Sequence, residues 1–421
     1  MDAISVGISY RPNFREFCLS EDGRRLIGHL EMPIENITGY GTVSASAMRL
    51  SRQYPVILHG VSQSFGSESF PSRSDSVRIT QQAVELLRPA WVGDHISTSL
   101  HQGGDSRQLL PVERSEEMAK EVAGRANSFR RAVGVPVVLE YIAHAFDPGG
   151  PLTESEFIRS VMRETECGLL LDLHNIYANS MNFGFDPFAF LAELPMDRVT
   201  QIHIAGGETA NGFYFDSHNS GVPDVVWGLL SESIARTGST AITLERDDPA
   251  ACTAEIIADL EKATHIAKDA LRGSPAHMRN STARPMPAKT IRHESKTTLH
   301  DIGNSCEHSR KSRTCATIRR AYPFSWEIIE NQIVNNWRVF EKAGERYASA
   351  ADKASAALSL VAETLPAQHR WRADIDAQLS RLIFAEDSED PIVVEFSVEN
   401  EYYVLRRNSD LTITVKRHAV C

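Results

Sequence analysis

Eight short apolar runs, each the length of a β-strand, recur within the first 272 residues of this 421-residue chain. They cover residues 5–10, 28–35, 55–60, 91–97, 136–142, 168–174, 199–206 and 241–246. Runs such as Val137-Val138-Leu139 and Leu169-Leu170-Leu171 are continuously apolar instead of alternating with polar residues. A strand has this pattern when both of its faces are buried. The runs therefore favour a parallel sheet that is covered by helices.

Helical patterning fills most of the gaps between these runs, at residues 74–87, 115–133, 153–166, 187–194, 224–237 and 254–272. In the third of these segments, Thr153 followed by Glu156 predicts a capping box ahead of Phe157 and Ile158. Eight strands that alternate with helices predict a (β/α)8 TIM barrel, a fold of about 250 residues. A doubly wound open sheet is the alternative. It is weakened because no G-x-G-x-x-G or P-loop motif follows any run.

Composition changes after the last helical segment. Residues 273–320 are rich in Ser, Thr and Pro and hold ten Lys and Arg against three Asp and Glu, so we expect a flexible basic linker. Residues 321–421 combine helical patterns at 326–347, 352–365 and 372–384 with strand-like runs at 392–398, 401–406 and 411–416. They predict a small α+β domain with an antiparallel meander, which follows a barrel domain at residues 1–272.

Net charge and cysteine usage exclude several classes of protein. A formal charge of -11 argues against a nucleic-acid binder and against a protein that binds anionic membranes. The N-terminal residues lack the features of a signal peptide, and no run approaches the roughly 18 apolar residues of a membrane span, so we expect a cytoplasmic protein. The six cysteines show no C-x-x-C spacing. We therefore expect mostly free thiols and no disulfide framework.

Metal-capable side chains stand where the apolar runs end or just beyond them. They are His59, His95, Glu140, Asp172, His174, Asn175, His203, Asp216, His218 and Glu245. In a parallel barrel the carboxyl ends of all strands meet at one mouth, so these side chains are expected to converge there. Each one alone is better explained as a hydrogen-bonded structural residue or as half of a salt bridge. Together they predict a metal site, because a shared cation removes the cost of burying so many polar groups.

The donor set also narrows the choice of metal. It contains nitrogen and oxygen but no thiolate, which suits iron, manganese or zinc and disfavours a structural zinc site. The donors are too many for one ion, so we expect two or three ions bridged by carboxylates such as Glu140. The residue types alone leave the choice between iron and zinc open.

Seven sequence blocks occur in order along the barrel segment. They lie at 58–62 (LHGVS), 94–97 (DHIS), 139–140 (LE), 171–177 (LDLHNIY) with 184–187 (GFDP), 202–206 (IHIAG), 216–218 (DSH) and 244–247 (LERD). Over residues 5–272 the chain thereby resembles the multinuclear non-heme iron-dependent oxidative enzymes, the family of the methanobactin-biosynthesis oxidase. The resemblance implies a TIM barrel with two or three iron ions in a mixed Fe2+/Fe3+ state. It also implies nine iron ligands, of which Glu140, Asp172 and His203 would be catalytic: His59, His95, Glu140, Asp172, Asn175, His203, Asp216, His218 and Glu245.

Members of this family typically use dioxygen to modify cysteine in ribosomally made precursor peptides, often with a separate partner protein that presents the peptide. The resemblance therefore implies an iron-dependent oxidoreductase that acts on a cysteine-containing precursor peptide. His174 ranks below Asn175 as a ligand, because relatives often carry another polar residue there. Tyr141 replaces the Asn that many relatives have after the glutamate, which puts substrate specificity in doubt. We expect His144, three residues further on, to lie at the surface.

Three alternatives stay open. Endonuclease IV-like phosphoesterases and sugar isomerases use a similar ligand scheme on the same barrel, and the Asp172-x-x-Asn175 spacing parallels an Asp-x-x-His pair of the former. Residues 321–421 are either a fused peptide-recognition module, working by strand addition at residues 411–416, or a structural appendage. Cys306 and Cys315 in the linker are either incidental or part of a fused substrate segment.

Overall fold

The computed structural model describes residues 4–39, 42–67, 71–101, 104–210, 212–238, 240–248, 251–273, 392–398, 401–407 and 413–419. The chain divides into two compact units. One comprises Met1–Ile37 and Ser46–Ile302, and the other comprises Thr38–Ala45 and Gly303–Cys421. The expected linker after Gly273, with Cys306 and Cys315, lies outside the described residues, as do the helical patterns expected between residues 321 and 391.

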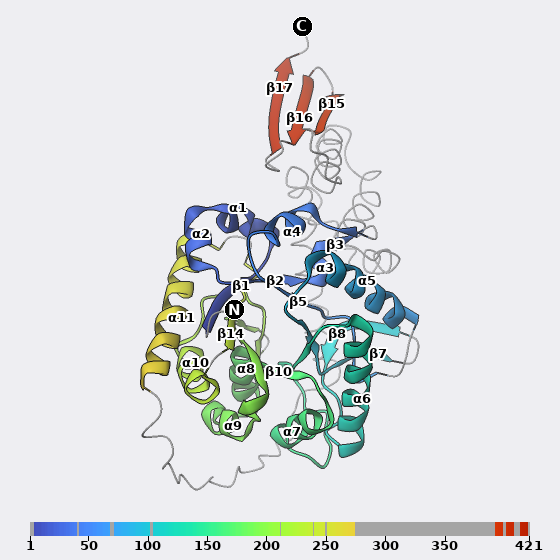
Figure 1. Ribbon diagram of the computed structural model, residues 1–421, viewed down its shortest axis with the longest axis vertical. Coiled ribbons are helices and arrows are strands. Elements are labelled where there is room, and N and C mark those ends of the chain that lie inside the picture. Colours follow the sequence, from blue (N-terminus) through green and yellow to red (C-terminus); the bar gives the residue numbers. More distant parts are fainter. Residues whose placement is uncertain are drawn as a thin grey trace. The chain divides into compact units, whose positions relative to one another are not determined.

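The first unit contains a closed barrel of eight parallel strands, in the order β1-β14-β11-β10-β9-β6-β5-β2 (Figure 1). The strands are β1 (Ile4–Ser9), β2 (Leu30–Pro33), β5 (Val56–His59), β6 (Val92–His95), β9 (Val137–Glu140), β10 (Gly168–Asp172), β11 (Val199–Ile204) and β14 (Thr240–Leu244). Each corresponds to one of the eight apolar runs. The TIM-barrel prediction is confirmed, and the alternative of an open sheet is wrong.

Helices surround the barrel on its outside (Figure 1). The longer ones are α5 (Pro71–Leu87), α6 (Glu116–Val133), α7 (Glu154–Glu164), α8 (Leu173–Phe183), α9 (Pro187–Glu193), α10 (Asp224–Thr237) and α11 (Thr253–Gly273). The capping box of α7 is present, because Thr153 and Glu156 each accept a hydrogen bond from the backbone of the other. No helix among the described residues is long and apolar enough to cross a membrane.

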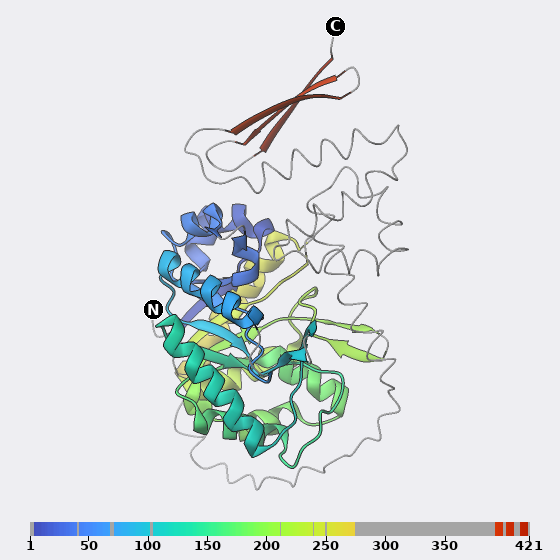
Figure 2. The same cartoon turned by 90° about the vertical axis from the view of Figure 1, so that its right-hand side faces the viewer.

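Short helices and two-stranded hairpins lie in the connections between the longer elements. They are α1 (Arg15–Leu19), α2 (Glu21–Leu26), α3 (Ile34–Ile37), α4 (Ala45–Leu50), the 3-10 turns Pro12–Phe14 and Met196–Arg198, and the hairpins β3–β4 (Thr38–Gly39, Thr42–Val43), β7–β8 (Thr98–His101, Gly104–Leu110) and β12–β13 (Glu208–Ala210, Phe213–Phe215). In Figure 2 the light green hairpin β12–β13 stands out from the barrel. None of these elements was expected from the sequence.

One strand boundary differs from the expectation in a way that matters for the site. The run at residues 168–174 was expected to be a strand throughout, but the strand ends at Asp172 and Leu173 begins α8. The apolar residues of LDLHNIY fit a helix as well as a strand, so periodicity could not place this boundary. As a result, His174 lies in the first turn of a helix and not at a strand end.

Strand pairing sets the positions of the side chains at the mouth. The register aligns His95 with Glu140 across β6 and β9, and Asp172 with His203 across β10 and β11. The strand residues next to them, such as Leu58, Leu139 and Leu171, are almost fully buried. The apolar strands therefore hold polar side chains at fixed positions around one end of the barrel.

The second unit contains a three-stranded antiparallel sheet in the order β15-β16-β17. Its strands are β15 (Ile392–Val398), β16 (Glu401–Arg407) and β17 (Ile413–Ala419). The three strand-like runs expected near the C-terminus are thus present as a meander. The α+β character of residues 321–421 as a whole stays a prediction.

Candidate metal centre

His59, His95 and Glu140 close three neighbouring strands, β5, β6 and β9. His59 Nε2 lies 3.2 Å and His95 Nε2 lies 3.3 Å from the same atom, Glu140 Oε2. The three atoms approach one another without the alignment of a hydrogen bond, since Glu140 Oε2 has no hydrogen-bond partner among the described residues. Two imidazole nitrogens and one carboxylate oxygen therefore face a common point.

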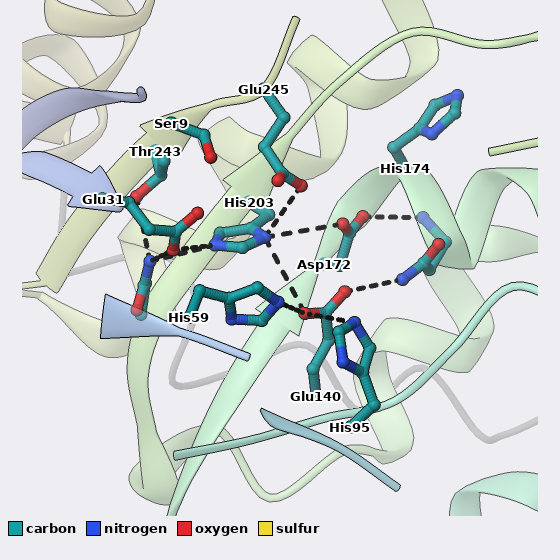
Figure 3. A network of polar contacts seen from close by, with 12 residues as sticks. Ser9, Glu31, His59, His95, Glu140, Asp172, His174, His203, Thr243 and Glu245 are labelled. Carbon is teal, nitrogen blue, oxygen red and sulfur yellow. Dashed lines mark hydrogen bonds and ion pairs between the residues drawn. The ribbon is translucent and has the colours of Figure 1, made fainter. Parts of the chain in front are cut away.

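His203 on β11 faces three carboxylates. Its Nδ1 lies 3.0 Å from Glu245 Oε2, 3.8 Å from Asp172 Oδ2 and 3.9 Å from Glu140 Oε2. β11 is flanked by β10, which ends at Asp172, and by β14, which ends one residue before Glu245. Glu140 belongs to both groups and joins them into one cluster (Figure 3).

The start of α8 orients two of these carboxylates. Asp172 Oδ1 accepts a hydrogen bond of 2.7 Å from the backbone N–H of Asn175 and caps the helix, which leaves Oδ2 to face His203. Asn175 donates from Nδ2 to Glu140 Oε1 and to the Tyr141 carbonyl, both at 3.0 Å. The Asp-x-x-Asn spacing is therefore the spacing of a helix N-cap and its third residue.

Asp216 and His218 come from the loop that follows β13. His218 Nε2 lies 2.8 Å from Asp216 Oδ1 and 3.6 Å from Glu245 Oε2. The backbone of His218 has a φ of 53°, which is uncommon for a residue other than glycine and is concentrated at functional sites. His174 lies 2.6 Å from the same Asp216 Oδ1 through Nδ1 and 3.2 Å from the Tyr214 hydroxyl through Nε2.

Three histidines have a second contact on the ring nitrogen that faces away from the cluster. These contacts join His95 Nδ1 to the Gly60 carbonyl at 3.1 Å, His203 Nε2 to Glu31 Oε2 at 2.7 Å, and His218 Nδ1 to Asp247 Oδ2 at 3.7 Å. The first two are hydrogen bonds, which fix the orientation and tautomer of a histidine so that its other nitrogen is free to bind a metal. The third is a longer, electrostatic contact.

Glu31 and Asp247 are not among the site residues expected from the sequence. Glu31 is fully buried on β2, and its sequence neighbours Leu30 and Met32 are also fully buried. A single carboxylate inside a buried apolar strand is itself a signal, because burial of a charge without a partner is costly. Asp247 carries a weaker signal, since a carboxylate beyond a strand end is common.

Burial and charge separate the pKa values of the cluster. Burial raises the pKa of Glu140 to about 8 and that of Asp172 to about 6. Burial lowers the pKa of His59 to about 4. At His95 burial acts in the same direction, but the charges of Glu140 and Asp94 outweigh it and raise the pKa to about 9. A cation that binds here must therefore displace at least one proton from the Glu140–His95 pair near neutral pH.

Several buried atoms of the cluster have no hydrogen-bond partner among the described residues. They are Glu140 Oε2, Asp172 Oδ2, Asn175 Oδ1, His203 Nδ1 and His218 Nε2. Buried polar atoms are normally paired, so unpaired atoms that share one site need an explanation. Three of the residue groups that could hold an ion are His59-His95-Glu140, Glu140-Asp172-His203 and Asp172-His218-Glu245. These donors fit a cation that prefers nitrogen and oxygen ligands.

The nine side chains expected as ligands form one continuous set of contacts in the structure. Their role as iron ligands stays a prediction. His174 also reaches this set, through its hydrogen bonds to Asp216 and to the Tyr214 hydroxyl. The expectation that His144 lies at the surface is wrong, because it is buried with its Nε2 2.6 Å from Glu154 Oε1. Asn179 and Asn182 of α8 bind the backbone of His144 and hold it inward.

Comparisons with known proteins match the barrel unit. The family model described as "RiPP precursor modification enzyme MbnB/TglH/ChrH" matches residues 5–268, where RiPP denotes a ribosomally made peptide that is later modified. A UPF0276 protein of Caulobacter vibrioides is 35% identical over 280 residues, which are 65% of this chain and 98% of that protein. A UPF0276 protein of Rhizorhabdus wittichii is 35% identical over 276 residues, which are 64% of this chain and 95% of that protein.

Among solved structures, a xylose isomerase domain containing protein of Salmonella typhimurium is similar with a TM-score of 0.48 and 10% sequence identity. The similarity covers 64% of this chain and 98% of the Salmonella protein.

Proposed function

Because the chain belongs to the RiPP precursor modification enzyme family MbnB/TglH/ChrH, we propose that it is an iron-dependent oxidoreductase that uses dioxygen to modify a cysteine in a precursor peptide. Family membership carries the coarser part of this statement, namely an enzyme of the class that modifies RiPP precursors. The iron, the dioxygen and the cysteine are the finer part. They rest on the resemblance to the multinuclear non-heme iron-dependent oxidative enzymes, and the nitrogen and oxygen donors of the site are compatible with them.

Nine residues would hold two or three iron ions: His59, His95, Glu140, Asp172, Asn175, His203, Asp216, His218 and Glu245. Iron, when bound, supplies sites for dioxygen and for a peptide thiolate together with one-electron redox chemistry. Glu140 would be shared between ions, because its Oε2 lies within 3.9 Å of three different histidines. Asn175 orients Glu140 from the far side by donating to Oε1.

One observation carries the metal part of the proposal. Nitrogen and oxygen atoms from six barrel strands or their following loops converge in a buried cluster, and five of them lack a hydrogen-bond partner among the described residues. Without a cation these atoms would stay without a partner among the described residues, at a cost of about 1–3 kcal/mol for each atom. No cysteine of the described residues belongs to these donor groups, which is compatible with a peptide thiolate as a further ligand.

The test is anaerobic reconstitution of the chain with Fe2+, followed by addition of dioxygen and a cysteine-containing peptide from a short reading frame beside the gene. We expect a mass change in the peptide that is confined to its cysteine and that disappears when this cysteine is replaced by serine. As a control, the Glu140→Gln variant of the chain should leave the peptide unmodified. Stoichiometric zinc in the purified chain, together with phosphodiesterase activity, would instead support the phosphoesterase alternative.

We further propose that residues 321–421 present the precursor peptide to the barrel. The sheet β15-β16-β17 ends on each side with an edge strand, and an extended peptide binds such an edge by adding a strand. Removal of residues 321–421 should raise the KM for the peptide and leave the iron content unchanged. An unchanged KM would favour a structural appendage.

A further inference from the structure

The interior of the barrel is polar directly beside the candidate metal centre. TIM barrels usually fill this space with branched apolar side chains. Here Glu31 from β2, Gln201 from β11 and Thr243 from β14 lie together, and all three are fully buried. Figure 3 shows Glu31 and Thr243 on the side of His203 away from Asp172. A buried carboxylate is costly, so its partners indicate what it does.

Trp91 determines the direction of the hydrogen bonds among Glu31, Gln201 and Thr243, which we call the polar layer. Its indole N–H, which can only donate, lies 2.7 Å from Gln201 Oε1. The amide NH2 of Gln201 therefore points the other way, where it donates to Glu31 Oε2 at 2.6 Å and to Thr243 Oγ1 at 2.9 Å. Both hydrogens of this amide are thus used, and Glu31 must act as an acceptor.

The tautomer of His203 follows from these contacts. His203 Nε2 lies 2.7 Å from Glu31 Oε2 and 2.9 Å from Gln201 Nε2. Since Gln201 has no hydrogen left to donate, and since a ring lone pair would repel the carboxylate, Nε2 carries a proton that it donates to Glu31. A neutral His203 then has its lone pair on Nδ1, the atom that faces Glu245, Asp172 and Glu140.

We propose that Glu31 is a positioning residue of the metal centre. It holds His203 in the Nδ1-ligating tautomer, and its negative charge makes that nitrogen a stronger donor. The chain Trp91-Gln201 holds Glu31 in turn. This role rests on the proposed function only in requiring a cation at the cluster, and it is independent of the peptide and of dioxygen. A carboxylate behind a ligating histidine raises ligand basicity, and its loss commonly weakens metal binding by about 10–100-fold.

The same polar layer offers a matched control. Beyond Thr243 the hydrogen bonds continue through His29, which lies 3.0 Å from Thr243 Oγ1 and 2.9 Å from Ser5 Oγ. Ser5 is buried too, and its removal also deletes one internal hydrogen bond. Ser5→Ala should therefore disturb the packing as Glu31→Gln does, but without touching His203.

The experiment titrates metal-free full-length chain with Co2+ and follows the visible d–d absorption. Glu31→Gln removes the negative charge behind His203. Its new NH2 either takes the place of Oε1, which has no hydrogen-bond partner among the described residues, or takes the place of Oε2 and opposes the NH2 of Gln201. We therefore expect an affinity about 10–100-fold lower and a shifted spectrum. Trp91→Phe frees the Gln201 amide to rotate and should give a smaller loss. Ser5→Ala should bind Co2+ with the wild-type affinity and spectrum. Circular dichroism and thermal unfolding establish that each variant is folded.

Two results overturn the inference while the proposed function stands, and a third would overturn both. Glu31→Gln with wild-type affinity and spectrum removes the positioning role and leaves the metal centre intact. An equal loss in Ser5→Ala assigns the effect to packing. A wild-type chain that binds neither Co2+ nor Fe2+ removes the metal centre, and the role of Glu31 with it.

Discussion

The two halves of the candidate metal centre differ in charge. Around Glu140 Oε2 stand two imidazoles, those of His59 and His95, at the ends of adjacent strands. We call this the imidazole-rich half. The carboxylate-rich half places Asp172, Asp216 and Glu245 around His203 and His218.

The pKa values of His59 and His203 differ in the direction that this division predicts, although the pKa of His95 in the imidazole-rich half is also raised, to about 9, by the charges of Glu140 and Asp94. Burial lowers the pKa of His59 to about 4, whereas the carboxylates raise the pKa of His203 well above its ordinary value although burial opposes them. An ion of higher charge is stabilised more by anionic oxygen donors than by neutral nitrogen donors. We therefore expect a preference for Fe3+ in the carboxylate-rich half and for Fe2+ in the imidazole-rich half.

The largest effect is expected for the residue that both halves share. Glu140→Gln removes the charge that faces His59, His95 and His203, so both halves should lose affinity, by more than about 100-fold, since even the loss of an outer partner costs about 10–100-fold. Metal content after desalting, measured by mass spectrometry of the elements, checks this. Glu154→Gln, in the ion pair with His144 outside the cluster, is the control. Full metal content in Glu140→Gln would contradict a shared carboxylate.

The second prediction separates the halves. His95→Ala should remove the ion of the imidazole-rich half and leave the other, whereas Glu245→Ala should do the reverse. Each variant should retain part of the wild-type metal, which is about half if two ions are bound, and after loading with iron the Mössbauer signals that remain should differ between the two. If each variant loses all of its metal, the halves form one inseparable unit and the comparison fails.

Features of the fold and of the metal centre could be predicted from the sequence where neighbouring residues determine them. Apolar continuity placed all eight strands, and barrel topology then brought residues as distant as His59 and Glu245 to one mouth. The start of α8 was missed because Leu173 and Ile176 suit both periodicities, although Asp172 as an N-cap followed by Asn175 offered a clue. The pairing of Glu31 with His203 was out of reach, since it joins side chains 172 residues apart across non-adjacent strands.

A pH-dependent effect of intermediate size tests the imidazole-rich half. Folding raises the pKa of His95 from its ordinary 6.5 to about 9. The proton on His95 therefore stabilises the metal-free fold fully below pH 6.5, and this stabilisation is lost as the pH rises through 9. Glu140, with a pKa of about 8, changes in the same direction, because the folded chain keeps a proton that the unfolded chain releases above 4.5. The metal-free chain should therefore have a lower Tm at about pH 8.5 than at about pH 6.5.

Metal loading should reverse this trend, since a cation binds the deprotonated donors. The gain in Tm on adding Co2+ is expected to be larger at the higher pH, and the dependence should weaken in His95→Ala. A gain in Tm that is independent of pH would show that no proton is displaced from these two groups.

The smallest effect is expected at the edge of the carboxylate-rich half. The Tyr214 hydroxyl lies 3.2 Å from His174 Nε2, and His174 in turn contacts Asp216. Tyr214→Phe removes this hydrogen bond, worth about 0.5–1.5 kcal/mol, together with the one that the Gly207 N–H donates to the same hydroxyl. Co2+ affinity should therefore fall by roughly two- to ten-fold in this half only. Tyr177→Phe is the matched control, because its ring packs against Tyr214 at 5.2 Å and the substitution leaves the Tyr214–His174 contact in place. A loss as large as that of Glu245→Ala would mean that His174 and Tyr214 belong to the cluster itself and do not merely support it.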